Sequence, residues 1–141
     1  MKKTASALPL ALAACIALAL SACGGSSSDH AGGTVSSSAG LPDGRITEGE
    51  QQALVKGAAT GQSCIDCHGE AGNNPLDPSY PKIGGQYRDY LGHALQQYRD
   101  GQREHALMSQ QAINLSDQQI ADLAAYFASQ PSQLTDLAGA H

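Results

Sequence analysis

Two cysteines two residues apart, followed at once by histidine, constrain this chain more than any other feature: Cys64-Ile65-Asp66-Cys67-His68. This order is the attachment pattern of a c-type haem, in which each thiol adds across one vinyl group of the porphyrin. The spacing lets both sulfurs reach neighbouring vinyl groups from one helical turn, and the next residue then lies under the iron as proximal ligand. The motif therefore predicts one covalent haem c, with His68 on the iron.

Two other interpretations of the motif make demands that the rest of the chain does not meet. A thioredoxin-like redox pair belongs in a βαβ setting, which the sequence pattern does not indicate. Half of a zinc site needs two further ligands at paired spacing, and the chain has no second Cys-x-x-Cys and no His-x3-His. Haem attachment through Cys64 and Cys67 is the interpretation that the sequence favours.

Length and composition are consistent with a small domain built around a cofactor. The 141 residues leave room for one domain, and with 4% aromatic residues and no tryptophan the side chains alone would make a thin core. A covalently held porphyrin would supply a large apolar centre. The net charge of −5 gives no electrostatic footprint for a nucleic-acid partner.

Residues 1–22 have the layout of a secretory signal peptide, with a basic start at Lys2 and Lys3 and an apolar run behind it. The run ends in Leu20-Ser21-Ala22-Cys23, which resembles a bacterial lipobox and implies that Cys23 becomes the lipidated first residue. A permanent transmembrane helix is the alternative, but Pro9 interrupts the run, which is shorter than the roughly 20 residues of a span. We therefore expect a lipid anchor on the periplasmic side of a bacterial membrane, with a soluble periplasmic protein as the alternative.

Residues 23–44 are predicted to form a flexible tether, because glycine, serine and alanine dominate them. Without residues 1–22 the chain keeps six lysines plus arginines against thirteen aspartates plus glutamates, a net charge of −7. A mildly acidic surface suits a partner with a basic docking face. Solubility alone explains the charge equally well.

The folded unit is predicted over residues 45–131, and residues 132–141 are predicted to be a disordered tail. Thr47 as N-cap, with Glu50 at the third helical position, predicts a first helix from about residue 48 to residue 60. Small side chains on one face of this helix favour a close contact with another helix.

Two further helices are predicted towards the C-terminus. Apolar residues at helical spacing form one stripe that we expect to belong to the core: Tyr87, Tyr90, Leu91, Ala94, Leu95 and Tyr98. Ser116 as N-cap and Gln119 as its reciprocal partner open the last helix, which ends before Pro131. The apolar face of that helix is expected to consist of Ile120, Leu123, Ala124 and Phe127.

Turn-forming residues from Gly69 to Pro78 predict a long irregular loop that wraps one side of the porphyrin. A ligating histidine usually donates its other N–H to a fixed acceptor. The carbonyl of Pro81 is our candidate acceptor for His68, and Ile83 is expected to lie against the macrocycle. An ordinary turn before a helix is the alternative for Pro81 and Ile83.

Met108 is the candidate sixth ligand of the iron, because it is the only methionine besides Met1 and lies between two predicted helices. A thioether holds the iron of an electron carrier and raises its potential. His105 is the rival ligand, and a His/His iron would have a lower potential. A gap-filling core methionine is the remaining alternative.

The complete order of elements, from Thr47 to Gln130, resembles the class I c-type cytochromes, particularly small bacterial periplasmic ones and one half of the dihaem cytochromes. The resemblance implies an all-α fold of three to four helices with long loops around one haem. It also implies that the first and last helices cross, with the Gly57 region against residues 123–127. One haem edge would remain open to partners. Unlike the dihaem members, this chain has a single haem motif.

The function that follows is a one-electron carrier between periplasmic or membrane redox partners, with His68 and Met108 on the iron and no enzymatic activity. An electron-entry subunit of a larger oxidoreductase is one alternative. A haem enzyme or gas sensor with a labile sixth ligand is another. The sequence names neither the electron donor nor the acceptor.

Overall fold

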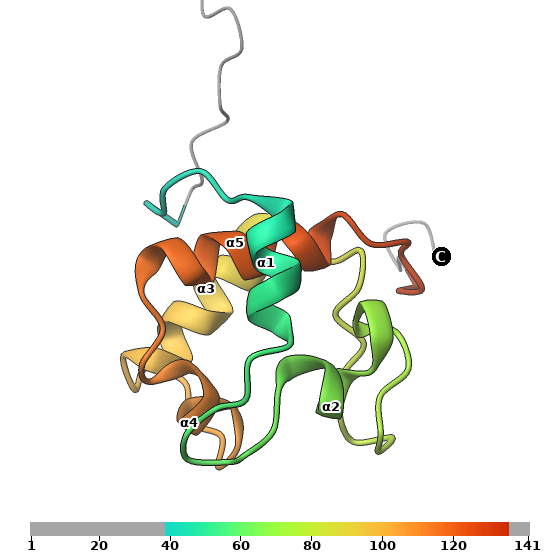
Figure 1. Cartoon of the computed structure of the whole chain (residues 1–141), viewed down its shortest axis with the longest axis horizontal. Helices are drawn as coiled ribbons and strands as arrows, with labels where there is room; N and C mark the ends of the chain where they lie inside the picture. Colours follow the sequence, from blue (N-terminus) through green and yellow to red (C-terminus); the bar gives the residue numbers. More distant parts are fainter. Residues whose placement is uncertain (1–38, 136–141) are drawn as a thin grey trace, which may run out of the picture. The chain divides into compact units, whose positions relative to one another are not determined.

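The computed structural model describes residues 39–135, and this part of the chain is helical and has no strand (Figure 1). Its three longer helices are α1 (Ile46–Ala53), α3 (Arg88–Arg99) and α5 (Asp117–Ala128). Two helices of five residues, α2 (Cys64–His68) and α4 (Met108–Ala112), lie on the connections, together with the 3₁₀ turn η1 (Glu70–Gly72). The predicted all-α fold is confirmed, with short helical turns added to the three long helices.

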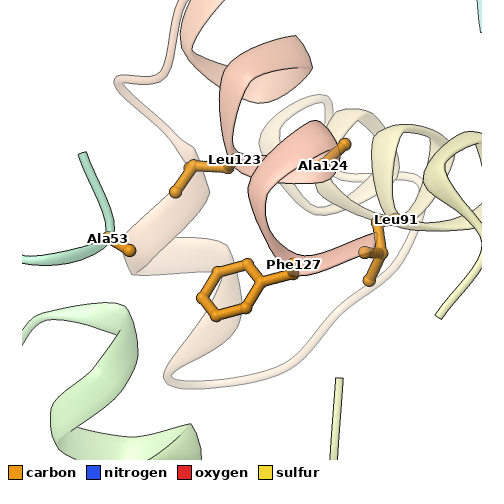
Figure 2. Close-up of a cluster of buried hydrophobic side chains, with 5 residues drawn as sticks. All are labelled: Ala53, Leu91, Leu123, Ala124 and Phe127. Atoms are coloured by element: carbon orange, nitrogen blue, oxygen red, sulfur yellow. The ribbon is translucent and has the colours of Figure 1, made fainter. Parts of the chain in front are cut away.

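Helix α5 forms the centre of the core, and it begins as predicted. The Ser116 hydroxyl accepts a hydrogen bond from the Gln119 N–H (3.2 Å), and the Gln119 side chain accepts one from the Ser116 N–H (2.9 Å). This reciprocal cap satisfies two donors that the first turn leaves without helical partners. The apolar face of α5 is buried, and part of it packs with α1 and α3 in one cluster: Ala53, Leu91, Leu123, Ala124 and Phe127 (Figure 2).

Helix α1 crosses α5 at Gly49, where the two backbones come into direct contact. A Cβ atom at Gly49 would overlap with the main-chain carbonyl of Asp122 and lie 2.7 Å from the Cβ of Tyr126. The expected contact between the Gly57 region and α5 is therefore wrong, although the crossing of the first and last helices is present. The helix has ended before Gly57, where a Cβ would instead approach the Gln111 side chain.

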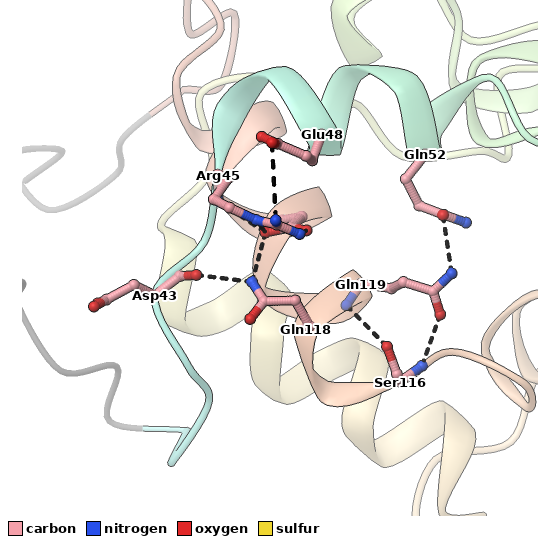
Figure 3. Close-up of polar contacts among 8 residues, drawn as sticks. Asp43, Arg45, Glu48, Gln52, Ser116, Gln118 and Gln119 are labelled. Carbon is pink, nitrogen blue, oxygen red and sulfur yellow. Dashed lines mark hydrogen bonds and ion pairs between the residues drawn. The ribbon is translucent and has the colours of Figure 1, made fainter.

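The start of α1 is fixed by a tertiary contact rather than by the predicted cap at Thr47. Arg45 is the N-cap; its backbone N–H donates to the Asp122 carboxylate (2.8 Å), and its guanidinium donates to the same group (2.7 Å). Gln118 also donates to Asp122 (2.8 Å) and to the carbonyl of Asp43 (2.9 Å) (Figure 3). These bonds hold the chain at residue 45, so the helix begins at Ile46.

The end of α1 also differs from the prediction, which extended the helix to residue 60. The helix ends at Ala53, and Leu54 and Val55 are 56% and 54% exposed. A tight turn follows, in which the Gly57 N–H donates to the Gln62 carbonyl (2.9 Å) and the Gly61 N–H to the Gly57 carbonyl (2.8 Å). Gly61 has φ +67°, which glycine adopts without strain. This turn redirects the chain towards α2.

Residues before α1 belong to the packed unit as well. Leu41 is buried against Ile120 and Ala121 of α5, and a Cβ at Gly44 would overlap with the Ala121 carbonyl. The tether predicted over residues 23–44 therefore overlaps the packed unit at its C-terminal end. The predicted signal peptide, Cys23 and the tail from residue 136 onwards lie outside the described residues. Within residues 39–135 no helix has the length and apolarity to span a membrane.

Helix α3 is tied to α5 by Arg99, whose guanidinium donates to the Leu115 carbonyl (3.2 Å) and to the Asp117 carboxylate (2.7 Å). The expectation that the whole stripe of α3 is core is wrong. Leu91 is buried, whereas Tyr87 is 78% exposed and Tyr90 is 51% exposed. The physical reason is that most of this stripe faces a cavity rather than another helix.

Candidate functional site

A cavity of about 620 Å³ is lined by residues of all five α-helices and of the connections between them. Cys64, Cys67 and His68 reach it from α2, and Met108 reaches it from α4, 40 residues further along the chain. Pro81 and Ile83 line it too. The fold thus brings every predicted site residue of the described range to one cavity.

Helix α2 presents the two cysteines and the histidine from little more than one turn. Ser63 caps it: its hydroxyl accepts from the Asp66 N–H (3.3 Å), and the Asp66 carboxylate accepts from the Ser63 N–H (2.7 Å). Both cysteines are half-buried and unpaired. Burial raises the pKa of the Cys64 thiol to about 11, so at neutral pH it carries its proton. A nucleophilic redox cysteine has a lowered pKa instead, which speaks against the thioredoxin-like interpretation.

His68 is buried and held in one orientation. Its side chain is bonded through Nδ1 to the Pro81 carbonyl (2.8 Å), the acceptor proposed from the sequence. Because a carbonyl can only accept, Nδ1 carries the proton and Nε2 keeps its lone pair. Burial lowers the pKa of His68, although the hydrogen bond to Pro81 acts in the opposite direction. A neutral imidazole with a free Nε2 is the form that binds a metal.

The loop that carries Pro81 and Ile83 is anchored at residues 83–85. The N–H groups of Ile83 and Gly84 donate to the Gly72 carbonyl (2.9 Å and 3.2 Å), and the Gly85 N–H donates to the Phe127 carbonyl of α5 (2.8 Å). Ile83 is half-buried and packs against the core cluster around Phe127. The loop therefore fixes the acceptor for His68 and places an aliphatic side chain on the cavity wall.

Met108 is the first residue of α4, so the predicted connection contains a short helix. Its side chain is half-buried and lines the cavity. His105, the rival ligand, is exposed and also lines the cavity, and its Nδ1 accepts hydrogen bonds from the N–H groups of Leu107 and Met108 (3.3 Å each). One ring nitrogen of His105 is therefore occupied in shaping the turn that presents Met108.

Basic side chains account for all the formal charge on the cavity wall: Lys56, Lys82 and Arg103 line it, and no aspartate or glutamate occurs among the described lining residues. The guanidinium carbon of Arg103 lies 4.8 Å from the centroid of the Tyr98 ring. A hydrogen bond to Tyr90 raises the pKa of Arg103 above its ordinary value. The sequence analysis missed Arg103, and the only signal for it was the tyrosine stripe that we assigned to the core.

The comparisons with known proteins agree with one another. The sequence model of the family described as Cytochrome c matches residues 53–131. Cytochrome c-554(548) of Halomonas halodenitrificans is 48% identical over 71 residues, which cover 48% of this chain and 84% of that protein. Cytochrome c4 of Pseudomonas aeruginosa is 47% identical over 77 residues, covering 52% of this chain and 38% of that protein.

A further relative, the thiosulfate dehydrogenase electron acceptor of Thiomonas intermedia, is 40% identical over 65 residues and matches 46% of this chain and 30% of its own length. Among solved structures, a cytochrome c4 of Acidithiobacillus ferrooxidans superposes with a TM-score of 0.53 at 30% identity, covering 67% of this chain and 55% of that one. The chain therefore spans most of the first relative but only 30 to 38% of the two longer relatives.

Proposed function

Since this chain belongs to the cytochrome c family and carries one covalent haem c, we propose that it is a one-electron carrier of the bacterial periplasm. The observation that carries the proposal is the meeting of Cys64, Cys67 and His68 with Met108 at one cavity. A covalent attachment site and two iron ligands of different chemistry are the parts that such a carrier needs.

The residues around the cavity fit the haem. Protein interiors are close-packed, and few voids exceed a water molecule, so a cavity of about 620 Å³ calls for a large occupant. Apolar side chains such as Leu91, Leu123 and Phe127 form part of its wall and suit a porphyrin face. The basic residues suit the two propionates, and the fixed imidazole of His68 suits the iron.

Each residue then has a definite task. Cys64 and Cys67 would hold the porphyrin through thioethers, and His68 and Met108 would bind its iron. The Pro81 carbonyl keeps the His68 ring in one orientation, and Ile83 covers part of one face. When bound, haem c supplies a one-electron couple on its iron. The hydrogen bond from Cys67 Sγ to Gln62 Oε1 (3.5 Å) requires the thiol proton, so it is lost once the thioether forms.

Electron transfer without catalysis follows from this arrangement, because two protein ligands leave the iron no position for a substrate. The donor and acceptor are then other redox proteins. The similarity to a thiosulfate dehydrogenase electron acceptor supports an oxidoreductase as one such partner. The alternative function, a tethered electron-entry subunit of a larger oxidoreductase, would use the same haem site.

Replacement of Met108 tests the ligand set. We expect Met108→Ala to let the reduced protein bind carbon monoxide within seconds at neutral pH and to lower the reduction potential, because a thioether raises it. His105→Asn is the matched control, since an amide oxygen can still accept from the Leu107 and Met108 N–H groups but is a poor ligand for the iron. Absorption spectra of both redox states, with and without carbon monoxide, give the measurement.

Three outcomes would contradict the proposal or its ligand set. Carbon monoxide binding by the unaltered protein would favour the haem enzyme or gas sensor. A mature protein without colour, or without the added mass of one haem, would remove the basis of the function. Loss of the sixth ligand in His105→Asn rather than in Met108→Ala would transfer that role to His105.

A further inference from the structure

Gln111 connects two segments of the cavity wall that are far apart in the sequence. It lies on α4, three residues after Met108, so both residues share one face of the helix. Its side-chain Nε2 donates to Thr60 Oγ1 (2.6 Å) and to the Gln62 carbonyl (2.8 Å). Both acceptors belong to the turn that leads into α2 and its cysteines.

The turn is shaped to receive this amide. Thr60 Oγ1 also accepts from the Gln62 N–H (3.2 Å), and the Gly57 N–H donates to the Gln62 carbonyl (2.9 Å), so both acceptors are held in place. A Cβ at Gly57 would lie 2.5 Å from the Gln111 side-chain oxygen. A larger residue at position 57 would therefore require the Gln111 amide to shift from its place in the turn.

Helix α4 is held at its start by local hydrogen bonds: the His105 ring accepts from the N–H groups of Leu107 and Met108, and the Ser109 hydroxyl accepts from the His105 N–H (3.1 Å). It has five residues, and its N-cap, Leu107, makes no side-chain hydrogen bond. A helix this short is marginal by itself, so tertiary contacts decide where it lies. Ala112 is buried and α4 packs on α3, and the Gln111 amide hydrogen-bonds α4 to the turn that precedes the cysteines.

We infer that Gln111 is a positioning residue that keeps Met108 on the iron by bonding α4 to the turn at residues 57–62. This inference rests on the proposed assignment of Met108 as the sixth ligand. The Gln111 amide joins α4 to the turn that precedes the cysteines. The haem would be a second, independent connection between Met108 and the cysteines. Opening of α4 then requires the two Gln111 hydrogen bonds to break.

Ligand exchange measures this opening directly. Imidazole added to the oxidised protein binds the iron only in the fraction of molecules whose methionine has left, so its apparent affinity scales with that fraction. Loss of two partly buried hydrogen bonds is expected to raise the fraction roughly five- to hundredfold. The apparent affinity for imidazole should rise by the same factor.

Imidazole titration of the oxidised holoprotein is therefore the experiment, with Gln111→Leu as the main variant. Thr60→Val removes one of the two acceptors and should give a smaller increase of the same sign. It also keeps the test open if Gln111→Leu does not fold. In the double variant Thr60→Val should add little, because both changes break the same bond. Ile113→Ala, an exposed residue directly after α4 that is not among the cavity-lining residues, is the control and should bind imidazole like the unaltered protein.

The outcomes separate this inference from the proposed function. Unchanged imidazole affinity in Gln111→Leu overturns the positioning role. This holds even if the free energy of global unfolding changes, because a purely structural role would change only that free energy. If Met108→Ala has the same spectrum and carbon monoxide behaviour as the unaltered protein, the ligand assignment fails and the positioning role fails with it. A raised affinity in Gln111→Leu and Thr60→Val but not in Ile113→Ala supports it.

Discussion

At the scale of single residues, Gly49 makes the strongest demand on the fold. We expect Gly49→Ala to destabilise the holoprotein by about 1–3 kcal/mol or more, because the new methyl group overlaps backbone that cannot move without separating α1 from α5. Urea unfolding followed by haem absorbance gives the measurement. Gln51→Ala, an exposed site on the same helix, is the control and should lie within about 0.5 kcal/mol of the parent. Equal midpoints for the two variants would contradict the tight crossing.

The residues that sequence reasoning reached and those that it missed differ in a physical way. Cys64, Cys67 and His68 are fixed by the chemistry of attachment, and Met108 could be proposed because it is the only methionine besides Met1. Gly49 and Gln111 carry no such signature. Their roles depend on contacts with segments that are distant in the sequence. Within its own helix, neither the glycine nor the glutamine differs from its neighbours in a pattern that would reveal such a contact.

At the scale of helices, the Arg45–Asp122 contact should make the α1–α5 crossing sensitive to acid. Burial opposes the charge on Asp122, but hydrogen bonds from Arg45 and Gln118 outweigh it, so the pKa of Asp122 is lowered. A lowered pKa stabilises the folded state above the unfolded pKa of about 3.9, and this stabilisation is lost as the pH falls through the folded value. Asp122→Asn should therefore lower the free energy of unfolding at pH 6 by about 1–3 kcal/mol.

The difference between Asp122→Asn and the parent should shrink as the pH falls below the unfolded pKa of about 3.9, because proton uptake by Asp122 then favours the unfolded parent. Urea unfolding at several pH values between 6 and 3 measures it, and taking the difference cancels the titration of groups that both proteins share. Asp117→Asn, on the exposed start of α5, tests whether any carboxylate of that helix has this effect. A difference that is constant with pH would contradict the role of the Asp122 charge.

The same contact explains why one helix was predicted well and another poorly. The start of α5 depends on Ser116 and Gln119, which are three residues apart and visible in the sequence. The start of α1 depends on Asp122, which is 77 residues from Arg45, so the local signal of Thr47 was misleading. The end of α1 depends on the turn at residues 57–62, which accepts hydrogen bonds from Gln111 of the distant α4.

At the scale of the whole molecule, the proposed attachment to a membrane through Cys23 is open to a direct test. We expect the unaltered chain, exported and matured in a bacterium, to incorporate labelled fatty acid and to begin at Cys23, because the preceding residues resemble a lipobox. Several acyl chains on one residue hold a protein to a bilayer, whereas one chain binds only marginally.

Cys23→Ser should lose the label and the added lipid mass while keeping the haem spectrum, since the described haem unit lies in residues 39–135. Cys15→Ser is the matched control within the N-terminal segment and should remain labelled. A mature N-terminus at any other residue, or haem protein without lipid from the unaltered gene, would make the carrier a soluble periplasmic protein.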